Sequence, residues 1–415
     1  MIAIASCGII VASIECQLND SVSTRALRAS NHLHQIKQII AGKGVRLTGS
    51  EPLAVIGHSR GGEAAAILAA EVRMGGAEWP LVSAAVLLAP TIDAPDRYNT
   101  EQYATAQLVI QGAVDGDTSG IGVKHFDLFN KFLTTGPVLG GSRQALIWFH
   151  GGRHASFLNS SFISQCPDVA AVPKVEMKTK NDSNLMLVDP NQNFVSRVYV
   201  ASFLRYTLLK DVTYRQWFNG DIAPKFVAPT PFLQSDIDKK LLVKVLGYAP
   251  SPTVSFCSSS NPNCMTAVGM SGATAIAMSA ILNCPHSRVG YKLTWSLAKN
   301  SLPFVAFASP QISWTGLASA VIEFDVAQPL EAVAPLSVGF GVTGPVTNIL
   351  HTFSVPIQQK LPNSSVQNLV MSTVRVPFSL FPKTTIASFK KVIFSFAKSA
   401  PIGTLYLSQL RVTLA

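Results

Sequence analysis

The chain has 415 residues, which is long enough for two domains with substantial hydrophobic cores. Hydrophobic residues make up 48% of it and charged residues only 13%, a composition that excludes a disordered chain and indicates a globular, sheet-rich protein. The formal net charge of +10 arises from scarce acidic residues and not from lysine clusters, so we expect no nucleic-acid partner. A preference for acidic polymers or anionic membrane surfaces is the alternative interpretation of this charge.

Strands and helices are predicted to alternate over residues 1–220. The predicted strands are residues 9–14, 53–56, 81–88, 107–111 and 145–149, and the predicted helices are 24–40, 63–73 and 194–209. Continuous apolar runs are typical of buried parallel strands, and apolar stripes are typical of helices that cover a sheet. The first 220 residues are therefore predicted to form an α/β domain with a doubly wound, mostly parallel sheet. In such sheets the functional groups collect at the carboxyl ends of the strands.

A proline-punctuated linker at residues 221–236 precedes a second domain, predicted to span residues 237–415. Its predicted strands include residues 289–296, 320–326, 336–342, 374–380, 391–396 and 405–414. Short strands at this spacing predict an all-β sandwich or jelly roll. The uncharged stretch 265–282 is diluted by Gly, Ser and Thr, so we expect no transmembrane segment.

The sequence is organised around Gly57-His58-Ser59-Arg60-Gly61, which joins an apolar strand to an alanine-rich helix. A Gly-x-Ser-x-Gly turn between strand and helix is the nucleophile elbow of α/β-hydrolases, in which the serine hydroxyl stands exposed above the sheet. The glycines leave room for the strained turn. We expect Arg60 to offer its backbone N–H to an oxyanion, His58 to pack or orient, and Glu63 to serve the first helical turn.

A serine nucleophile needs a base and a third group that orients the base, and in this topology they follow in the order Ser, Asp, His. Asp115 and Asp117 both follow the strand that ends near Gly112. Asp115 is the preferred acid because it stands three residues after that glycine, and Asp117 is the alternative. His154, in the loop after the next strand, is the preferred base, and His150 is the alternative.

Three motifs together resemble the α/β-hydrolases grouped with chlorophyllases and cutinase-like polyester hydrolases. They are residues 57–63, residues 112–117 and residues 152–157. The resemblance covers residues 1 to about 220 and implies a serine carboxylesterase. Such an enzyme would form an acyl-enzyme on Ser59, with His154 as base and Asp115 as the orienting acid. It would act on a small or polymeric ester.

Only 58 residues precede Ser59, and they look like the fourth strand of that fold and the helix after it. The usual first three strands, which carry a second oxyanion donor, are therefore expected to be missing. This departure keeps an alternative open: a catalytically impaired hydrolase-fold scaffold whose β-domain binds a glycan or a cell surface. Residues 374–381 and 405–412 resemble the last strands of galactose-binding-like jelly rolls appended to secreted hydrolases, which favours an extracellular or cell-envelope location.

No metal or other cofactor is expected, because the histidines and cysteines show no H-E-x-x-H or C-x-x-C spacing. Cys257 and Cys264 flank a turn-forming loop that a disulfide can close, and free thiols are the equal alternative. The apolar N-terminus lacks the basic residues that open a signal peptide.

Overall fold

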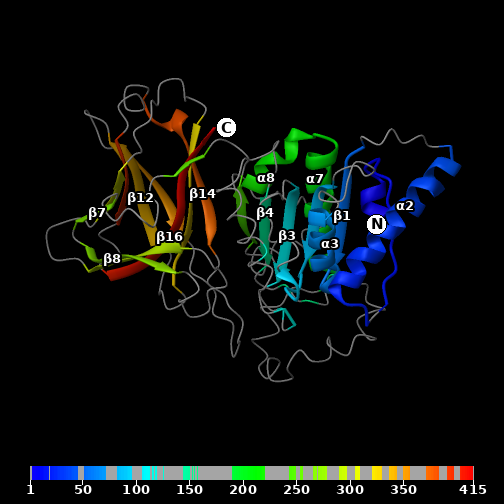
Figure 1. Ribbon diagram of the computed structural model, residues 1–415. Coiled ribbons are helices and arrows are strands. Elements are labelled where there is room, and N and C mark those ends of the chain that lie inside the picture. The colour runs from blue at the N-terminus through cyan, green and yellow to red at the C-terminus, as the bar shows by residue number, and fades with distance from the viewer. Residues whose placement is uncertain are drawn as a thin grey trace. The chain divides into compact units, whose positions relative to one another are not determined.

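The computed structural model divides the chain into two compact units (Figure 1). One comprises residues 1–250 with 361–367, and the other residues 251–360 with 368–415. The structure describes residues 2–17, 19–44, 51–71, 82–95, 105–112, 115, 117–118, 125, 144–149, 152, 154, 157, 189–219, 243–248, 253–255, 265–268, 270–277, 289–296, 304–308, 320–329, 336–343, 349–355, 371–382, 390–396 and 402–414.

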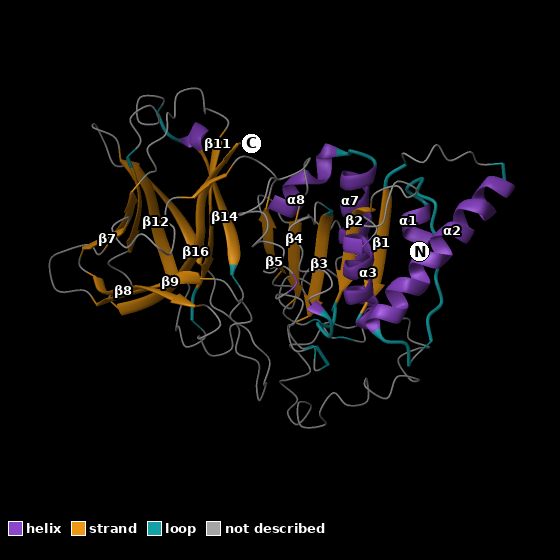
Figure 2. Cartoon of the chain, in the orientation of Figure 1, coloured by secondary structure: helices purple, strands orange, loops and turns teal. Residues whose placement is uncertain are grey.

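The first unit is built on a five-stranded sheet with the strand order β1-β2-β3-β4-β5 (Figure 2). Its strands are β1 (Leu53–His58), β2 (Val82–Leu88), β3 (Ala106–Gly112), β4 (Gln144–Phe149) and β5 (Val243–Tyr248). The first four are parallel and β5 runs antiparallel to β4. The four parallel strands match the predicted ones to within three residues at each end, because their apolar runs mark them clearly in the sequence.

Helices cover this sheet. They are α1 (Ile2–Ala5), α2 (Val22–Gly42), α3 (Arg60–Glu71), α7 (Asp189–Leu208) and α8 (Arg215–Asn219), with a 3₁₀ turn, η4 (Val212–Tyr214). Helix α7 buries Tyr199 and Phe203 in a core cluster that includes Val86 and Ile110 of the sheet. Leu87 lies between Val86 and Leu88 in β2, which both pack at this cluster, so its side chain points to the opposite face of the sheet. Leu87 is fully buried as well, so both faces of the sheet are covered.

The strand predicted at residues 9–14 is not formed. Residues 9–17 have no regular secondary structure, and the side chain of Ile10 is 59% exposed. A strand needs a neighbour that accepts and donates its backbone hydrogen bonds. In the described part of the sheet β1 pairs with β2 alone, so residues 9–14 do not join it, and the apolar residues before them form α1.

The boundary between the units also differs from the predicted one. Residues 243–248 pair with β4 along its length, so the first unit extends to Pro250 rather than ending near residue 220. The linker predicted at residues 221–236 lies outside the described residues. An alternating strand pattern does not reveal which sheet the strand joins, which is why the sequence placed this segment in the second domain.

The second unit consists of two antiparallel sheets, which confirms the predicted β-sandwich. Their strand orders are β13-β12-β15-β10-β7 and β14-β11-β16-β9-β8, and β6 pairs with β16. The strands are β6 (Thr253–Ser255), β7 (Met265–Val268), β8 (Met270–Ala277), β9 (Val289–Ser296), β10 (Phe304–Ala308), β11 (Ala320–Ala327), β12 (Leu336–Thr343), β13 (Ile349–Val355), β14 (Ser372–Pro377), β15 (Lys391–Phe396) and β16 (Ile402–Leu414). The predicted strand 374–380 stops at Pro377, and Phe378–Leu380 form a 3₁₀ turn.

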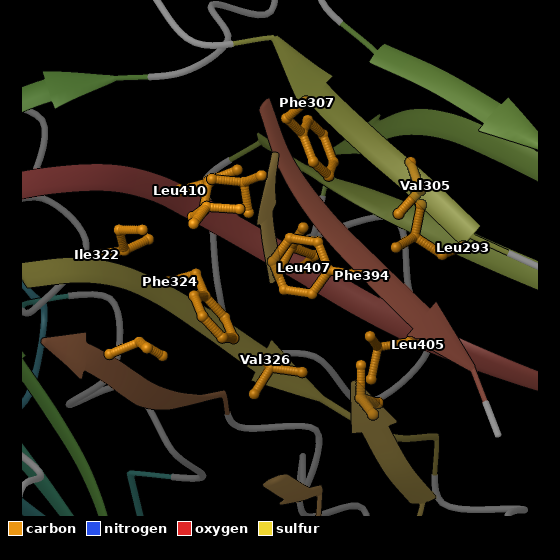
Figure 3. Close-up of a cluster of buried hydrophobic side chains, with 14 of the residues drawn as sticks. Leu293, Val305, Phe307, Ile322, Phe324, Val326, Phe394, Leu405, Leu407 and Leu410 are labelled. Carbon is orange, nitrogen blue, oxygen red and sulfur yellow. The ribbon is translucent and has the colours of Figure 1, made fainter. Parts of the chain in front are cut away.

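Aromatic side chains from both sheets meet in the core of this unit (Figure 3). The rings of Trp295 in β9 and Phe396 in β15 stack with their centroids 4.0 Å apart. Phe324 of β11 meets Phe394 of β15 edge to face at 4.9 Å. These contacts join the two sheets face to face, as in a sandwich.

A buried ionic group lies on the other face of the β14-β11-β16 sheet. Glu323 alternates with the core residues Ile322 and Phe324, so its side chain points away from the hydrophobic core. Its carboxylate lies 2.8 Å from Nε of Arg375 in β14 and 2.9 Å from Nη2 of Arg411 in β16. All three side chains are at most 6% exposed, so the carboxylate is the counter-ion of two buried guanidinium groups.

The uncharged stretch at residues 265–282 contains β7 and β8. Among the helices that the structure describes, none combines the length and apolar character required to cross a bilayer.

Candidate active site

Ser59 stands at the turn between β1 and α3, with a left-handed backbone (φ 55°) that is strained for a serine. Its backbone N–H donates to the carbonyl of Leu88 in β2, at 2.9 Å. A Cβ on Gly57 would lie 1.9 Å from the carbonyl oxygen of Gly61, so only glycine fits there. The sequence motif therefore forms the sharp strand-to-helix turn that was predicted for it.

Arg60 is the first residue of α3. The N–H groups of the first helical turn have no acceptor within their own helix and lie at its positive end. The backbone N–H of Arg60 lies at this helix end and can therefore donate a hydrogen bond to a negative oxygen beside Ser59.

Asp115 and His154 lie against each other, with Nδ1 of His154 2.9 Å from Oδ2 of Asp115. Asp115 follows β3, His154 follows β4, and these strands are parallel neighbours, so their carboxyl ends bring the two residues together. Asp115 is completely buried. Its carboxylate also accepts hydrogen bonds from Gln111 Nε2 (2.8 Å), Thr118 N (2.8 Å), Thr118 Oγ1 (2.8 Å) and Asp117 N (3.0 Å).

These donors decide the ionisation state of Asp115. Burial alone would raise the pKa of its carboxyl group. The hydrogen bond and positive charge of His154, together with the donors of Thr118, outweigh burial and hold the pKa below its ordinary value. Asp115 is therefore an anion fixed in position, as the orienting partner of an imidazole must be.

Asp117 contacts the other nitrogen of the same imidazole. Its Oδ2 lies 3.1 Å from Nε2 of His154, and its side chain is 40% exposed. The two aspartates that competed for one role in the sequence thus occupy different sides of His154. His150, the alternative base, lies outside the described residues.

His58 connects the histidine loop to the serine turn. Its Nε2 lies 3.0 Å from the backbone carbonyl of His154, and the two imidazole rings lie 4.5 Å apart between centroids. The ring of Phe157 also lies near His58, with the two ring centroids 5.7 Å apart. Because His58 immediately precedes Ser59, these contacts place the His154 loop beside the Ser59 turn. His58 therefore packs against the His154 loop, and an orienting role for it stays a prediction.

The pKa of His58 is lowered from 6.5 to about 3, first by burial and then by the charge of His154. The folded-state pKa is below the unfolded one, so the unfolded chain takes up the proton first as the pH falls. We expect the free energy of unfolding to decrease from pH 6.5 toward pH 3, by up to ~1.4 kcal/mol per pH unit from this residue. Urea unfolding of His58→Gln at several pH values should give a flatter dependence, and a slope equal to that of the natural chain would contradict this assignment.

Glu63 has a larger role than the one predicted for it. It is fully buried, and its carboxylate accepts hydrogen bonds from Thr91 Oγ1 (2.6 Å), Asp93 N (2.8 Å) and Ala94 N (2.6 Å). Thr91 N in turn donates to the carbonyl of Ser59, at 3.4 Å. Glu63 therefore connects the loop after β2 to the Ser59 turn, in addition to its place in the first turn of α3.

The sequence did not point to Gln111, Thr118 or the loop contacts of Glu63. A signal existed for two of them, since Gln111 interrupts an apolar strand next to the acid loop and Glu63 opens an otherwise alanine-rich helix. A polar side chain in a buried element needs a hydrogen-bond partner there. Thr118 had no such signal.

The described residues contain no cluster of three or more His, Cys, Asp or Glu side chains suited to a metal ion. Among the described residues, Cys7 and Cys16 take part in no disulfide. Cys257 and Cys264, with the disulfide predicted as one alternative, lie outside the described residues.

No protein-family model and no curated protein matches the chain. Solved structures resemble part of it. One is an exo-β-agarase (13% identity, TM-score 0.30, 39% of this chain and 24% of that one). Another is a family 11 carbohydrate-binding module from Clostridium thermocellum in complex with a β-1,3-1,4-mixed-linked tetrasaccharide (10% identity, TM-score 0.29, 39% and 96%). A third is a family 30 carbohydrate-binding module (11% identity, TM-score 0.27, 35% and 77%).

The chain spans about a quarter of the agarase it resembles. Scores at this level assign the chain to no family and give it no ligand. What the structure establishes is an α/β unit with four parallel strands and a β-sandwich unit. The glycan or surface ligand expected for the second unit stays a prediction.

Proposed function

We propose that the chain is a serine carboxylesterase of the α/β-hydrolase type, as its sequence motifs imply. The observation that carries the proposal is the contact between His154 Nδ1 and the buried, ionised Asp115, formed beside the strained turn of Ser59. A buried carboxylate that fixes one nitrogen of an imidazole leaves the other nitrogen to act on a nearby hydroxyl.

In the proposed reaction Oγ of Ser59 attacks the ester carbonyl carbon while its proton passes to Nε2 of His154. The tetrahedral intermediate collapses, the C–O bond to the alcohol breaks, and His154 returns the proton to the leaving alcohol. Water then attacks the acyl-enzyme while His154 takes its proton. The bond between the acyl carbon and Ser59 Oγ breaks, His154 returns the proton to Oγ, and the acid is released. Asp115 stays ionised throughout and stabilises the imidazolium.

The negative oxygen of each tetrahedral intermediate is stabilised by the backbone N–H of Arg60 at the start of α3. The left-handed turn at Ser59 supports this role, because it positions the nucleophile directly before that helix. Hydrolase folds supply a second donor from a loop outside this turn.

Covalent labelling with a fluorophosphonate tests the proposal. We expect the natural chain to be labelled at Ser59 and Ser59→Ala to remain unlabelled, as read by intact mass and peptide mapping. Since Ser59→Ala removes only one oxygen atom, its circular dichroism serves as the control for folding. A folded natural chain that stays unlabelled would instead support the scaffold hypothesis, in which the second unit binds a glycan or a cell surface.

A further inference from the structure

The nitrogen that the proposed reaction requires is already in contact with a second carboxylate. Nε2 of His154 must accept the proton of Ser59, yet in the structure it lies 3.1 Å from Oδ2 of Asp117. Asp117 is not part of the buried network around Asp115 except through its backbone N–H. With 40% of its side chain exposed, the Asp117 carboxylate can turn away into solvent without breaking that network.

We propose that Asp117 is a pH-dependent latch on His154: at low pH its carboxylate binds Nε2, the nitrogen that Ser59 requires, and at higher pH it releases that nitrogen. This inference rests on the proposed esterase function. Asp117 is a positioning residue in it and takes no part in the bond-making steps.

The physical reason lies in the donors and acceptors of the two groups. An imidazolium donates from both nitrogens, so it suits a place between the carboxylates of Asp115 and Asp117. A neutral imidazole that donates from Nδ1 to Asp115 presents a lone pair at Nε2. That lone pair faces the negative oxygen of Asp117 unfavourably, but it suits the hydroxyl of Ser59. Loss of one proton therefore changes the preferred partner of Nε2.

Other titratable groups of the described elements also lie against His154. Asp115 favours the imidazolium as Asp117 does, but it binds Nδ1 and keeps that bond in either protonation state. His58, at the end of β1, has its pKa lowered to about 3 by burial and by the charge of His154, so it carries no charge near neutral pH. Of these described groups, Asp117 is the charge whose contact depends on the proton of Nε2.

The test is the pH dependence of fluorophosphonate labelling in the natural chain and in Asp117→Asn. Removing a carboxylate beside an imidazole lowers the pKa of the imidazole. The midpoint of the rise in labelling rate with pH should therefore shift to a pH lower by ~0.5–1 unit in Asp117→Asn. One pH unit below the natural midpoint, Asp117→Asn should be labelled about three to five times faster than the natural chain. Asp93→Asn is the matched control, because it removes an exposed carboxylate from the neighbouring loop, and its midpoint should not move.

NMR titration of the His154 ring gives a readout that does not depend on activity, and the same downward shift is expected in Asp117→Asn. Labelling with an unchanged midpoint in Asp117→Asn would overturn the latch and leave the esterase proposal standing. An equal shift in Asp93→Asn would also overturn it, because the effect would then be one of net charge. Absence of labelling at every pH in every variant would overturn both proposals.

Discussion

Asp115→Asn is expected to lower the turnover of short p-nitrophenyl esters by ~10³–10⁴. The asparagine keeps the size of the side chain but loses the charge that stabilises the imidazolium. It also presents its NH₂ group to a network in which all the neighbours of Asp115 donate. His154 would then lose both its orientation and its counter-ion.

The matched control is Asp117→Asn, which removes a carboxylate from the other side of the same imidazole. Near neutral pH we expect it to change turnover by less than ~10-fold, since Asp117 acts only on where Nε2 points. Steady-state rates of the two variants, each shown to be folded by circular dichroism, decide which aspartate orients His154. If Asp117→Asn lost more activity than Asp115→Asn, the orienting role would belong to Asp117.

Glu323→Ala is expected to destabilise the β-sandwich by ~3–5 kcal/mol. The substitution removes the carboxylate that contacts both Arg375 and Arg411, and it leaves two buried guanidinium groups without this shared counter-ion. Removing a counter-ion from buried charges costs more than removing the same number of apolar atoms, so the effect should exceed that of an ordinary strand substitution.

Hydrogen exchange of peptides from β11, β14 and β16 in the full chain measures this loss in the second unit. Lys391→Ala is the control, because Lys391 is an exposed charge at the start of β15 and its removal should change stability by less than ~0.5 kcal/mol. A loss below ~1 kcal/mol in Glu323→Ala would show that the ionic group contributes little to folding.

Much of the architecture could be predicted, because the burial of a strand determines the order of apolar and polar residues along it. Strand β9, predicted as residues 289–296, has those bounds in the structure because apolar and polar residues alternate to its end. Residues 9–14 have an equally apolar pattern but form no strand, since strand formation depends on a neighbour that a local pattern does not reveal. Residues 243–248 were not predicted as a strand and fell within the range assigned to the second domain, because their pairing with β4 is a long-range contact that no local pattern reveals.

Part of the candidate site could likewise be predicted from the sequence, and part of it could not. Residues at fixed positions relative to strand ends, such as Asp115 and His154, could be predicted because parallel strands align their carboxyl ends. The division of the two imidazole nitrogens between Asp115 and Asp117 could not, because it depends on loop geometry within a few ångströms. The contacts of Glu63 with residues 91–94 join segments about thirty positions apart, and no local rule relates them.

The central claim is that Asp115 acts on Ser59 through His154. The measurement that tests it most directly is a double-mutant cycle on the rate of fluorophosphonate labelling, with Asp115→Asn made in the natural chain and in a His154→Ala chain. If the three residues act as one unit, Asp115→Asn slows labelling strongly in the natural chain and has almost no further effect once His154 is removed. Equal effects in the two backgrounds would contradict the account.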